Sequence, residues 1–189
     1  VLQPAFDRLL QLAGGVTLDT EEESIGPTKV IGQAKDDVAD LAEVHARHQA
    51  PDYQPVLVEE QVRIELPGPR DLLAVIDLVD DERRVVDFKT AKRKKAQDDA
   101  DGSVQLTVYA AHQALTGEKP EVVRLDTLVQ TAKKTERQIL DSTRDDADLI
   151  ALSHRINAIT AAVDAGIFPP TTPDNWMCSP RWCGFWNSC

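Results

Sequence analysis

Residues 72–89 read LLAVIDLVDDERRVVDFK, two arms rich in aliphatic and β-branched residues on either side of a polar turn. Such arms favour β-strands, and a turn this short lets them pair directly as an antiparallel hairpin. In that hairpin Asp77 lies opposite Asp87 or the residue before it. Side chains alternate along a strand, so Asp87 and Lys89 share one face while Phe88 points into the other layer. The hairpin is therefore expected to bring together two carboxylates and one ammonium group.

A close pair of carboxylates favours a bound cation. Two neighbouring carboxylates repel each other, and each raises the pKa of the other unless positive charge lies between them. Hard oxygen ligands of this kind suit Mg²⁺ or Mn²⁺. The alternative is a solvated polar face of the hairpin, which is common in antiparallel sheets. The hairpin taken alone leaves both interpretations open.

The composition is that of an ordinary globular domain. At 189 residues the chain is long enough to bury a core, and 42% hydrophobic with 28% charged residues is typical of such proteins. No apolar run approaches the roughly 18 residues of a membrane span, so we expect a cytoplasmic protein without a membrane partner. The first residues lack an initiator Met and a signal-peptide pattern, so we expect further residues upstream.

The distribution of charge is more informative than its sum. A net charge of -11 argues against indiscriminate binding to nucleic acid, but it permits a local basic surface. Five positive charges directly follow or close the hairpin: Lys89, Lys92, Arg93, Lys94 and Lys95. We interpret this run as a DNA-phosphate contact beside the carboxylates, with a solvated basic loop as the alternative.

The remaining periodicity places helices and strands around the hairpin. Four helices are expected: over residues 2–13, between the loop at residues 16–28 and Pro51, over residues 103–116, and from residue 142 or 143 to Gly166. Two further strands are expected, over residues 56–66 and 121–130. On the 103–116 helix, Ser103 is the expected cap, and Gln105 and Tyr109 share a face because they are four residues apart.

All three cysteines, Cys178, Cys183 and Cys189, lie within the last twelve residues, among three tryptophans and Phe185. In a reducing cytosol, clustered thiols favour metal ligation over disulfides. The spacing differs from the paired knuckle of a zinc ribbon, and an iron-sulfur cluster normally requires a fourth ligand. An iron-sulfur cluster, Zn²⁺ and unligated thiols therefore all remain open.

The order helix, three strands, helix, strand resembles the core of the PD-(D/E)XK nuclease superfamily, and its RecB-like branch in particular. The resemblance covers about residues 56–189 and rests on Glu60, Asp77, the Asp87-Phe88-Lys89 triplet, the Gln105-Leu-Thr-Val-Tyr109 segment and the cysteine tail. It implies an α/β fold: an αβββαβ restriction-endonuclease-like core, with a mixed sheet flanked by helices, over residues 1–170. It further implies an iron-sulfur tail over residues 171–189 that packs on this core.

The resemblance also implies roles for individual residues. Asp77, Asp87 and the backbone carbonyl of Phe88 would ligate Mg²⁺ or Mn²⁺. Lys89 would orient the attacking water or neutralise charge in the transition state.

Other matched residues would support this site. Gln105 and Tyr109 would position the DNA strand or brace the site, although such residues also occur at ordinary helix interfaces. Glu60 matches an acidic position on the first strand whose role is less defined. The three cysteines would hold a [4Fe-4S] cluster with a fourth ligand from outside this chain.

Two departures from the family pattern stand out. Ala74 occupies a position where relatives often have Gly. The family's metal-binding His on an N-terminal helix has no counterpart in residues 1–13. His45 is a fallback ligand, and the alternative is that His45 and His48 lie near a helix C-terminus because its dipole favours cations there.

The resulting prediction is a metal-dependent DNA nuclease that hydrolyses phosphodiester bonds, of the exonuclease type found in recombination and repair. Its substrate would be single-stranded DNA or duplex ends, and a recombination protein or helicase is a candidate partner. The alternative is a catalytically silent DNA-binding or scaffold module. The intact set of Asp77, Asp87 and Lys89 favours the enzyme, because a silent module has no need of all three.

Overall fold

The computed structural model describes residues 4, 7, 8, 11, 12, 25–65, 70–117, 119–169, 171, 172, 174–180 and 182–188. The chain divides into two units, residues 1–149 and residues 150–189. Most of the helix predicted at residues 2–13 lies outside the described residues, as does Cys189.

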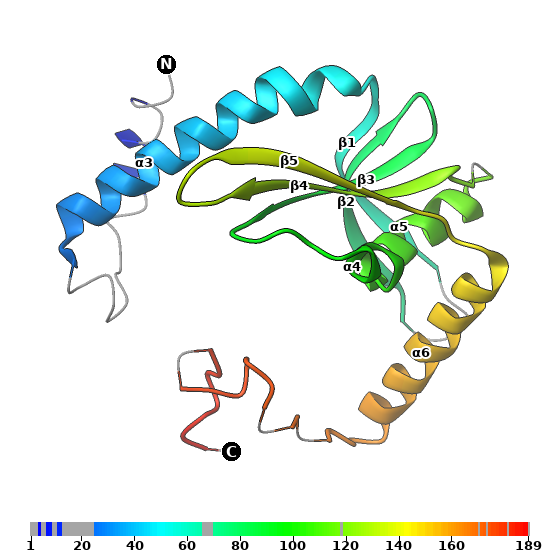
Figure 1. Cartoon of the computed structure of the whole chain (residues 1–189). Coiled ribbons are helices and arrows are strands. Elements are labelled where there is room, and N and C mark those ends of the chain that lie inside the picture. Colours follow the sequence, from blue (N-terminus) through cyan, green and yellow to red (C-terminus); the bar gives the residue numbers. More distant parts are fainter. Residues whose placement is uncertain are drawn as a thin grey trace. The chain divides into compact units, whose positions relative to one another are not determined.

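A five-stranded mixed sheet forms the centre of the first unit (Figure 1). Its strands are β1 (Pro55–Ile64), β2 (Leu72–Asp80), β3 (Arg84–Ala91), β4 (Val122–Gln130) and β5 (Thr135–Ser142), in the order β1-β2-β3-β4-β5. Strands β3 and β4 are parallel, and every other neighbouring pair is antiparallel. The predicted hairpin, the strands on both sides of it and the mixed sheet are confirmed.

Strand β5 was not predicted. Its residues, Thr-Glu-Arg-Gln-Ile-Leu-Asp-Ser, pair with β4 from Gln130↔Thr135 to Val123↔Ser142. The expectation that Ser142 or Thr143 caps the following helix was therefore wrong. Helix α6 (Asp146–Asp164) begins instead with a reciprocal capping box: the Asp148 N–H donates to Asp145 Oδ1 at 3.0 Å, and the Asp145 N–H donates to Asp148 Oδ2 at 2.9 Å.

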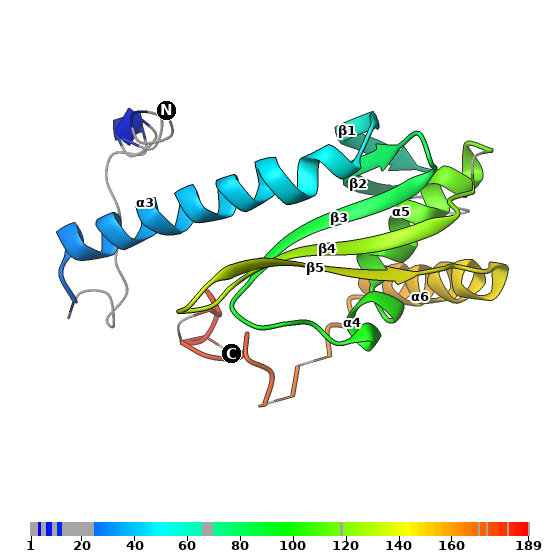
Figure 2. The ribbon, with the colours of Figure 1, turned by 45° about the horizontal axis from the view of Figure 1, so that its top comes forward.

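Helices cover both faces of the sheet. Helix α3 (Pro27–Val44) starts with Pro at its first position and continues through a π-helical turn (His45–Gln49) into a short 3-10 turn (Ala50–Asp52). Figure 2 shows α3 on one face of the sheet, with α4 (Gln97–Asp101) and α5 (Val104–Leu115) on the other. Ser103 caps α5 as predicted, because its Oγ accepts the Leu106 N–H at 3.2 Å.

The core has a part on each face. Under α5, Leu106 and Ala110 pack with Val85 and Val123 of the sheet, all nearly inaccessible to solvent. On the opposite face Tyr53 follows the helical turns and packs with Leu78, Val86 and Phe88. Burial of such aliphatic side chains contributes roughly 1.5–3 kcal/mol each, so both helical layers are held by apolar contact with the sheet.

A buried ionic cluster ties the segment after α3 to the far strands. Asp126 of β4 is fully buried and accepts hydrogen bonds from Tyr53 Oη at 2.6 Å and from Arg137 Nη2 at 2.7 Å. Arg137, on β5, also donates to the His48 carbonyl and to Asp52. Burial and the Asp126 hydrogen bond raise the pKa of Tyr53 to about 12, so its hydroxyl stays a donor at neutral pH.

The second unit holds most of α6 and the tail. Helix α6 ends in a Schellman motif, in which Gly166 at φ 68° lets the Ile167 N–H donate to the Ala162 carbonyl at 2.8 Å. In the tail, the rings of Trp176 and Trp182 meet edge to face at 5.4 Å. No helix in the described part of the chain is both long and apolar enough to span a membrane.

Removing the buried carboxylate should destabilise the first unit strongly. We expect Asp126→Ala to lower the free energy of unfolding by about 3–5 kcal/mol, because it removes the buried carboxylate that pairs with Arg137 and accepts the Tyr53 hydroxyl. Urea unfolding followed by circular dichroism measures this. The control Arg63→Ala, which breaks an exposed ion pair with Asp71, should change the free energy by less than about 1 kcal/mol. Equal effects of the two substitutions would contradict this account.

Candidate active site

Strands β2 and β3 of the central hairpin separate at the position of the acidic residues. Backbone pairing joins Leu78 with Val86 and Val79 with Val85, next to the turn. Beyond these pairs a side chain replaces the backbone contact: the Phe88 N–H donates to Asp77 Oδ2 at 2.9 Å. The Asp77 carboxylate is thus held between β2 and β3, opposite Asp87 as the hairpin geometry predicts.

Asp87 is buried beside a lysine that neutralises it. Its side chain is only 2% exposed, and Lys89 Nζ lies 2.7 Å from its Oδ1. Burial raises the pKa of Asp87, the Lys89 ammonium lowers it, and the nearby charge of Asp77 raises it further, with a net increase. The alternation predicted for β3 places Asp87 and Lys89 together as expected.

Helix α5 completes a chain of hydrogen bonds around the two carboxylates. Lys89 Nζ donates to Gln105 Oε1 at 3.3 Å, and Gln105 Nε2 donates to Tyr109 Oη at 2.6 Å. Tyr109 Oη in turn lies 3.4 Å from Asp77 Oδ1. Burial, together with the charges of Asp77 and Asp87, raises the pKa of Tyr109 to about 12, so the phenol remains protonated. Five predicted residues therefore form one connected network.

Other predicted residues do not join this network. Glu60 is exposed on β1, where its backbone lies opposite Ile76, the residue before Asp77. His45 lies 2.6 Å, through Nδ1, from Gln49 Oε1 and meets the Phe88 ring edge to face at 6.2 Å. Among the described residues, no group of three or more His, Cys, Asp or Glu side chains is arranged to hold a metal ion.

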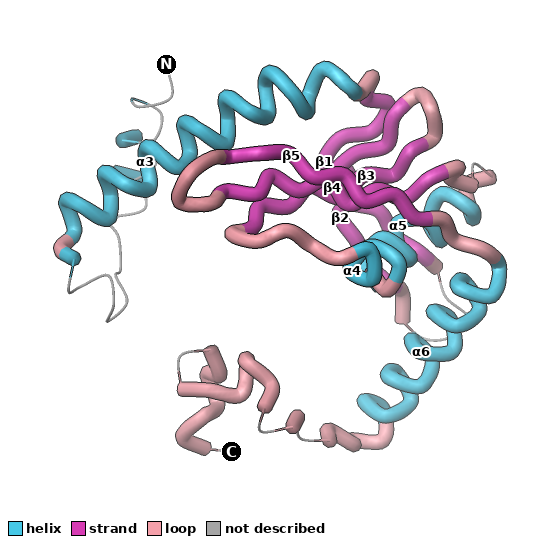
Figure 3. Tube along the Cα trace, viewed as in Figure 1, coloured by secondary structure: helices cyan, strands magenta, loops and turns pink. Residues whose placement is uncertain are grey.

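The predicted DNA-binding run forms the exposed loop between β3 and α4 (Figure 3). Lys92 Nζ lies 2.8 Å from Gln130 Oε1 and 3.4 Å from Asp37, and Lys94 pairs with Glu136 at 3.1 Å. Arg93 and Lys95 are exposed too. The loop starts at Lys92, three residues after Lys89, so its charges lie on the chain segment that leaves the site.

Two supporting residues were missed. Asp80 is buried and accepts the Glu82 and Arg84 N–H groups at 3.1 and 2.9 Å, which fixes the hairpin turn. The sequence could have indicated this role of Asp80, since Asp is favoured at the first position of a turn. Arg144 anchors the start of α5 through the Ala100 carbonyl at 2.7 Å and Thr107 Oγ1 at 2.8 Å. That position depends on β5, which the sequence pattern did not reveal.

Comparison with known families agrees with this geometry. A family model described as the PD-(D/E)XK nuclease superfamily matches residues 4–189. The chain belongs to the PD-(D/E)XK nuclease superfamily. The superfamily is described as one of nucleases, and PD-(D/E)XK nucleases generally use Mg²⁺ or Mn²⁺. None of the curated proteins matches the sequence.

Solved structures can be aligned with this PD-(D/E)XK chain. One, from Eubacterium rectale and described as a "Putative exonuclease", aligns with a TM-score of 0.50 at 17% identity over 79% of this chain. The chain spans 60% of that protein's length. The structure of SSO0001 aligns over 100% of this chain and 95% of its own, with a TM-score of 0.44 and 14% identity. The five-stranded mixed sheet flanked by helices is consistent with a restriction-endonuclease-like core.

The raised pKa of Asp87 predicts how stability depends on pH without metal. A carboxyl whose pKa is higher in the folded protein loses stability as pH rises from its unfolded pKa through its folded pKa. Asp87→Asn removes this ionisation, so the metal-free variant should unfold at a higher temperature than wild type at neutral pH. Below about pH 4 the two should converge. Thermal unfolding in EDTA across this range measures the effect.

The matched control is Asp81→Asn, in the exposed turn of the same hairpin. It should leave the pH profile of wild type unchanged. An Asp87→Asn protein that unfolds at a lower temperature than wild type at neutral pH would show that the Lys89 pair outweighs the penalty of burying Asp87.

Proposed function

We propose that this protein is a Mg²⁺- or Mn²⁺-dependent DNA exonuclease of the RecB-like branch, acting on single-stranded or duplex ends in recombination or repair. The carrying observation is the network in which Lys89 contacts the buried Asp87 while Gln105 and Tyr109 link Lys89 to Asp77. Such a network holds an ammonium and two carboxylates in fixed positions at one end of a hairpin. This arrangement supports hydrolysis rather than a silent scaffold.

The donor set fits a hard divalent cation. Asp77 and Asp87 supply carboxylate oxygens, and the Phe88 carbonyl is a neutral third donor. Asp77 raises the pKa of Asp87, so the carboxylates are close enough to repel, and positive charge between them would relieve that repulsion. A bound Mg²⁺ or Mn²⁺ would supply Lewis acidity toward the scissile phosphate and acidify its water.

The chain's own side chains would do the positioning. Lys89 Nζ, held by Asp87 and Gln105, would orient the attacking water or stabilise charge on the phosphate oxygens. Tyr109 stays protonated, so it can keep donating to Asp77 and fix that carboxylate. Glu60 would support the site from β1.

The basic loop would hold the substrate backbone. Lys92, Arg93, Lys94 and Lys95 are all exposed on the segment that follows the site lysine. Phosphate contacts from such a loop would give affinity without sequence preference, as an exonuclease requires. An acidic protein with one basic segment would confine DNA to that segment.

Activity measurements test the assignment. Degradation of linear single- and double-stranded DNA with Mg²⁺ or Mn²⁺ should fall at least about 1000-fold in Asp77→Asn, Asp87→Asn and Lys89→Ala, since each removes several kcal/mol of transition-state stabilisation. Tyr109→Phe should lose about 10- to 100-fold, because it only orients a ligand. The control Lys119→Ala removes an exposed lysine paired with Asp146 and should retain full activity. Undiminished degradation by Asp87→Asn would reject the proposed site.

For the tail we propose a [4Fe-4S] cluster held by Cys178, Cys183 and Cys189 with a fourth ligand from outside the given chain. Cys178 and Cys183 are half-buried free thiols on consecutive turns, and their N–H groups bond Asn175 and Ser179 carbonyls at 2.8 and 2.9 Å. Soft thiolates suit iron and sulfide, and Zn²⁺ is the alternative occupant.

Metal analysis of anaerobically purified natural protein separates these occupants. We expect about four iron and four sulfide per chain and a brown colour that Cys183→Ser abolishes. The control Ser179→Ala should keep both, since its hydroxyl donates to the Trp176 carbonyl and replacing it removes no thiolate. Stoichiometric zinc without sulfide would replace the cluster by a zinc site, and absence of both metals would reject metal binding by the tail.

A further inference from the structure

A cavity lies on the face of β3 and β4 opposite α5, next to the proposed catalytic lysine. Its volume is about 430 Å³, and it is lined by His45, Gln49, Phe88, Lys89, Thr90 and Leu128. The strand alternation explains the lining: Phe88 and Thr90 point to this side of β3, and Leu128 is the neighbour of Thr90 on β4. Lys89 also lines the cavity, and its Nζ lies 2.7 Å from Asp87 Oδ1.

One lining residue, Gln49, carries a buried hydrogen-bonding group that no described residue satisfies. Gln49 is 2% exposed, and its Oε1 is occupied by His45 Nδ1 at 2.6 Å. Among the described residues, its Nε2 has no hydrogen-bond partner. A buried amide donor left unpaired is costly, and such groups are rare in folded proteins. An acceptor brought by a ligand would satisfy it.

The lining chemistry matches a nucleobase. Phe88 and His45 supply aromatic rings, Leu128 an apolar wall, and Gln49 a single donor suited to a carbonyl oxygen or ring nitrogen. Proteins recognise unpaired bases by such combinations of aromatic contact and edge hydrogen bonds. A volume of about 430 Å³ falls in the range of small-ligand sites.

We propose that this cavity binds one nucleobase of the strand being cleaved, at the nucleotide whose phosphate lies against Lys89. This inference rests on the proposed nuclease function and adds a substrate class to it: single strands or frayed ends rather than intact duplex. A base inside a duplex would first have to leave its stack, which is unfavourable.

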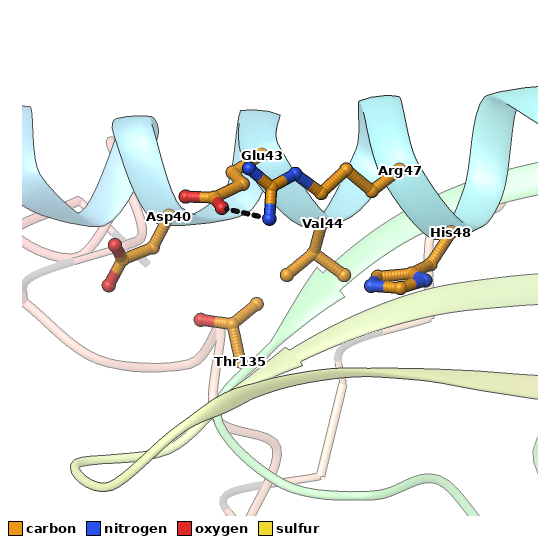
Figure 4. A pocket seen from close by; sticks show the side chains of 6 residues that line it. All are labelled: Asp40, Glu43, Val44, Arg47, His48 and Thr135. Carbon is orange, nitrogen blue, oxygen red and sulfur yellow. Dashed lines mark ion pairs between the residues drawn. The ribbon is translucent and has the colours of Figure 1, made fainter.

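A neighbouring hollow offers a matched control. It lies between α3 and the start of β5, has a volume of about 260 Å³, and is lined by Asp40, Glu43, Val44, Arg47, His48 and Thr135 (Figure 4). Arg47 and Glu43, four residues apart on the helical side of this hollow, form an ion pair at 2.9 Å. Thr135 and Thr90 are both threonines on strands that face a hollow beside the end of α3, so the same substitution can be made at each.

The test moves a single abasic nucleotide along a single-stranded oligodeoxynucleotide. In wild type, the abasic residue beside the cleaved phosphate should lower kcat/KM about 10- to 100-fold, and distant positions should have little effect. Thr90→Trp fills the cavity from its exposed rim, so it should lower kcat/KM on the intact strand and remove most of the abasic penalty. Gln49→Leu, which keeps the shape and removes the unpaired donor, should reduce that penalty. Thr135→Trp should behave as wild type.

Binding measurements separate failure of this inference from failure of the nuclease assignment. The same oligodeoxynucleotides are titrated in EDTA against Asp87→Asn protein, alone and combined with Thr90→Trp or Thr135→Trp, by fluorescence anisotropy. Loss of affinity at one abasic position, abolished only by Thr90→Trp, supports the base site even if wild type proves inactive. Cleavage and binding that are equally insensitive to every abasic position, or a penalty unchanged by Thr90→Trp, would overturn it.

Discussion

The burial of Asp87 is the constraint on which the site depends. A carboxylate at 2% exposure must be paired or neutralised, and Lys89, two residues along the same strand, is the nearest group that can do so. That pairing fixes Lys89, and Lys89 in turn fixes Gln105 of α5. The buried charge of Asp87 thus determines where Lys89 and Gln105 lie, and helix α5 must present Gln105 at that place.

The rest of the sheet holds this arrangement by stronger contacts than the site itself supplies. Near the site, the Asp77 carboxylate takes the Phe88 N–H, so β2 and β3 are joined there through a side chain. Away from it, β3 and β4 pair along their whole length, and the Asp126–Arg137 cluster joins β4 and β5 to the segment after α3. Few backbone pairs join β2 and β3 near the site, and the full pairing of β3 with β4 keeps the site residues in register.

The sequence predicted local geometry well and long-range geometry poorly. Asp77, Asp87 and Lys89 were placed correctly because a short turn and a two-residue period settle their relative positions. Gln105 and Tyr109 followed from a helical spacing of four. Strand β5 was missed because its polar sequence has no strong period and its conformation is settled by pairing with β4. The unpaired amide of Gln49 was equally invisible, since it depends on a π-helical turn packed against distant strands.

The alternation along β3 connects the two sides of the proposed substrate site. Asp87 and Lys89 face α5, and Phe88 and Thr90 face the end of α3, so one strand supplies both a charged surface and an apolar cavity. A nucleotide has the same division, with an anionic phosphate at one end and a flat, largely apolar base at the other. Lys89 lines the cavity and its ammonium contacts Asp87, so this single residue belongs to both surfaces. A strand end built in this way can select a nucleotide by both parts at once, which a surface of charge alone cannot do.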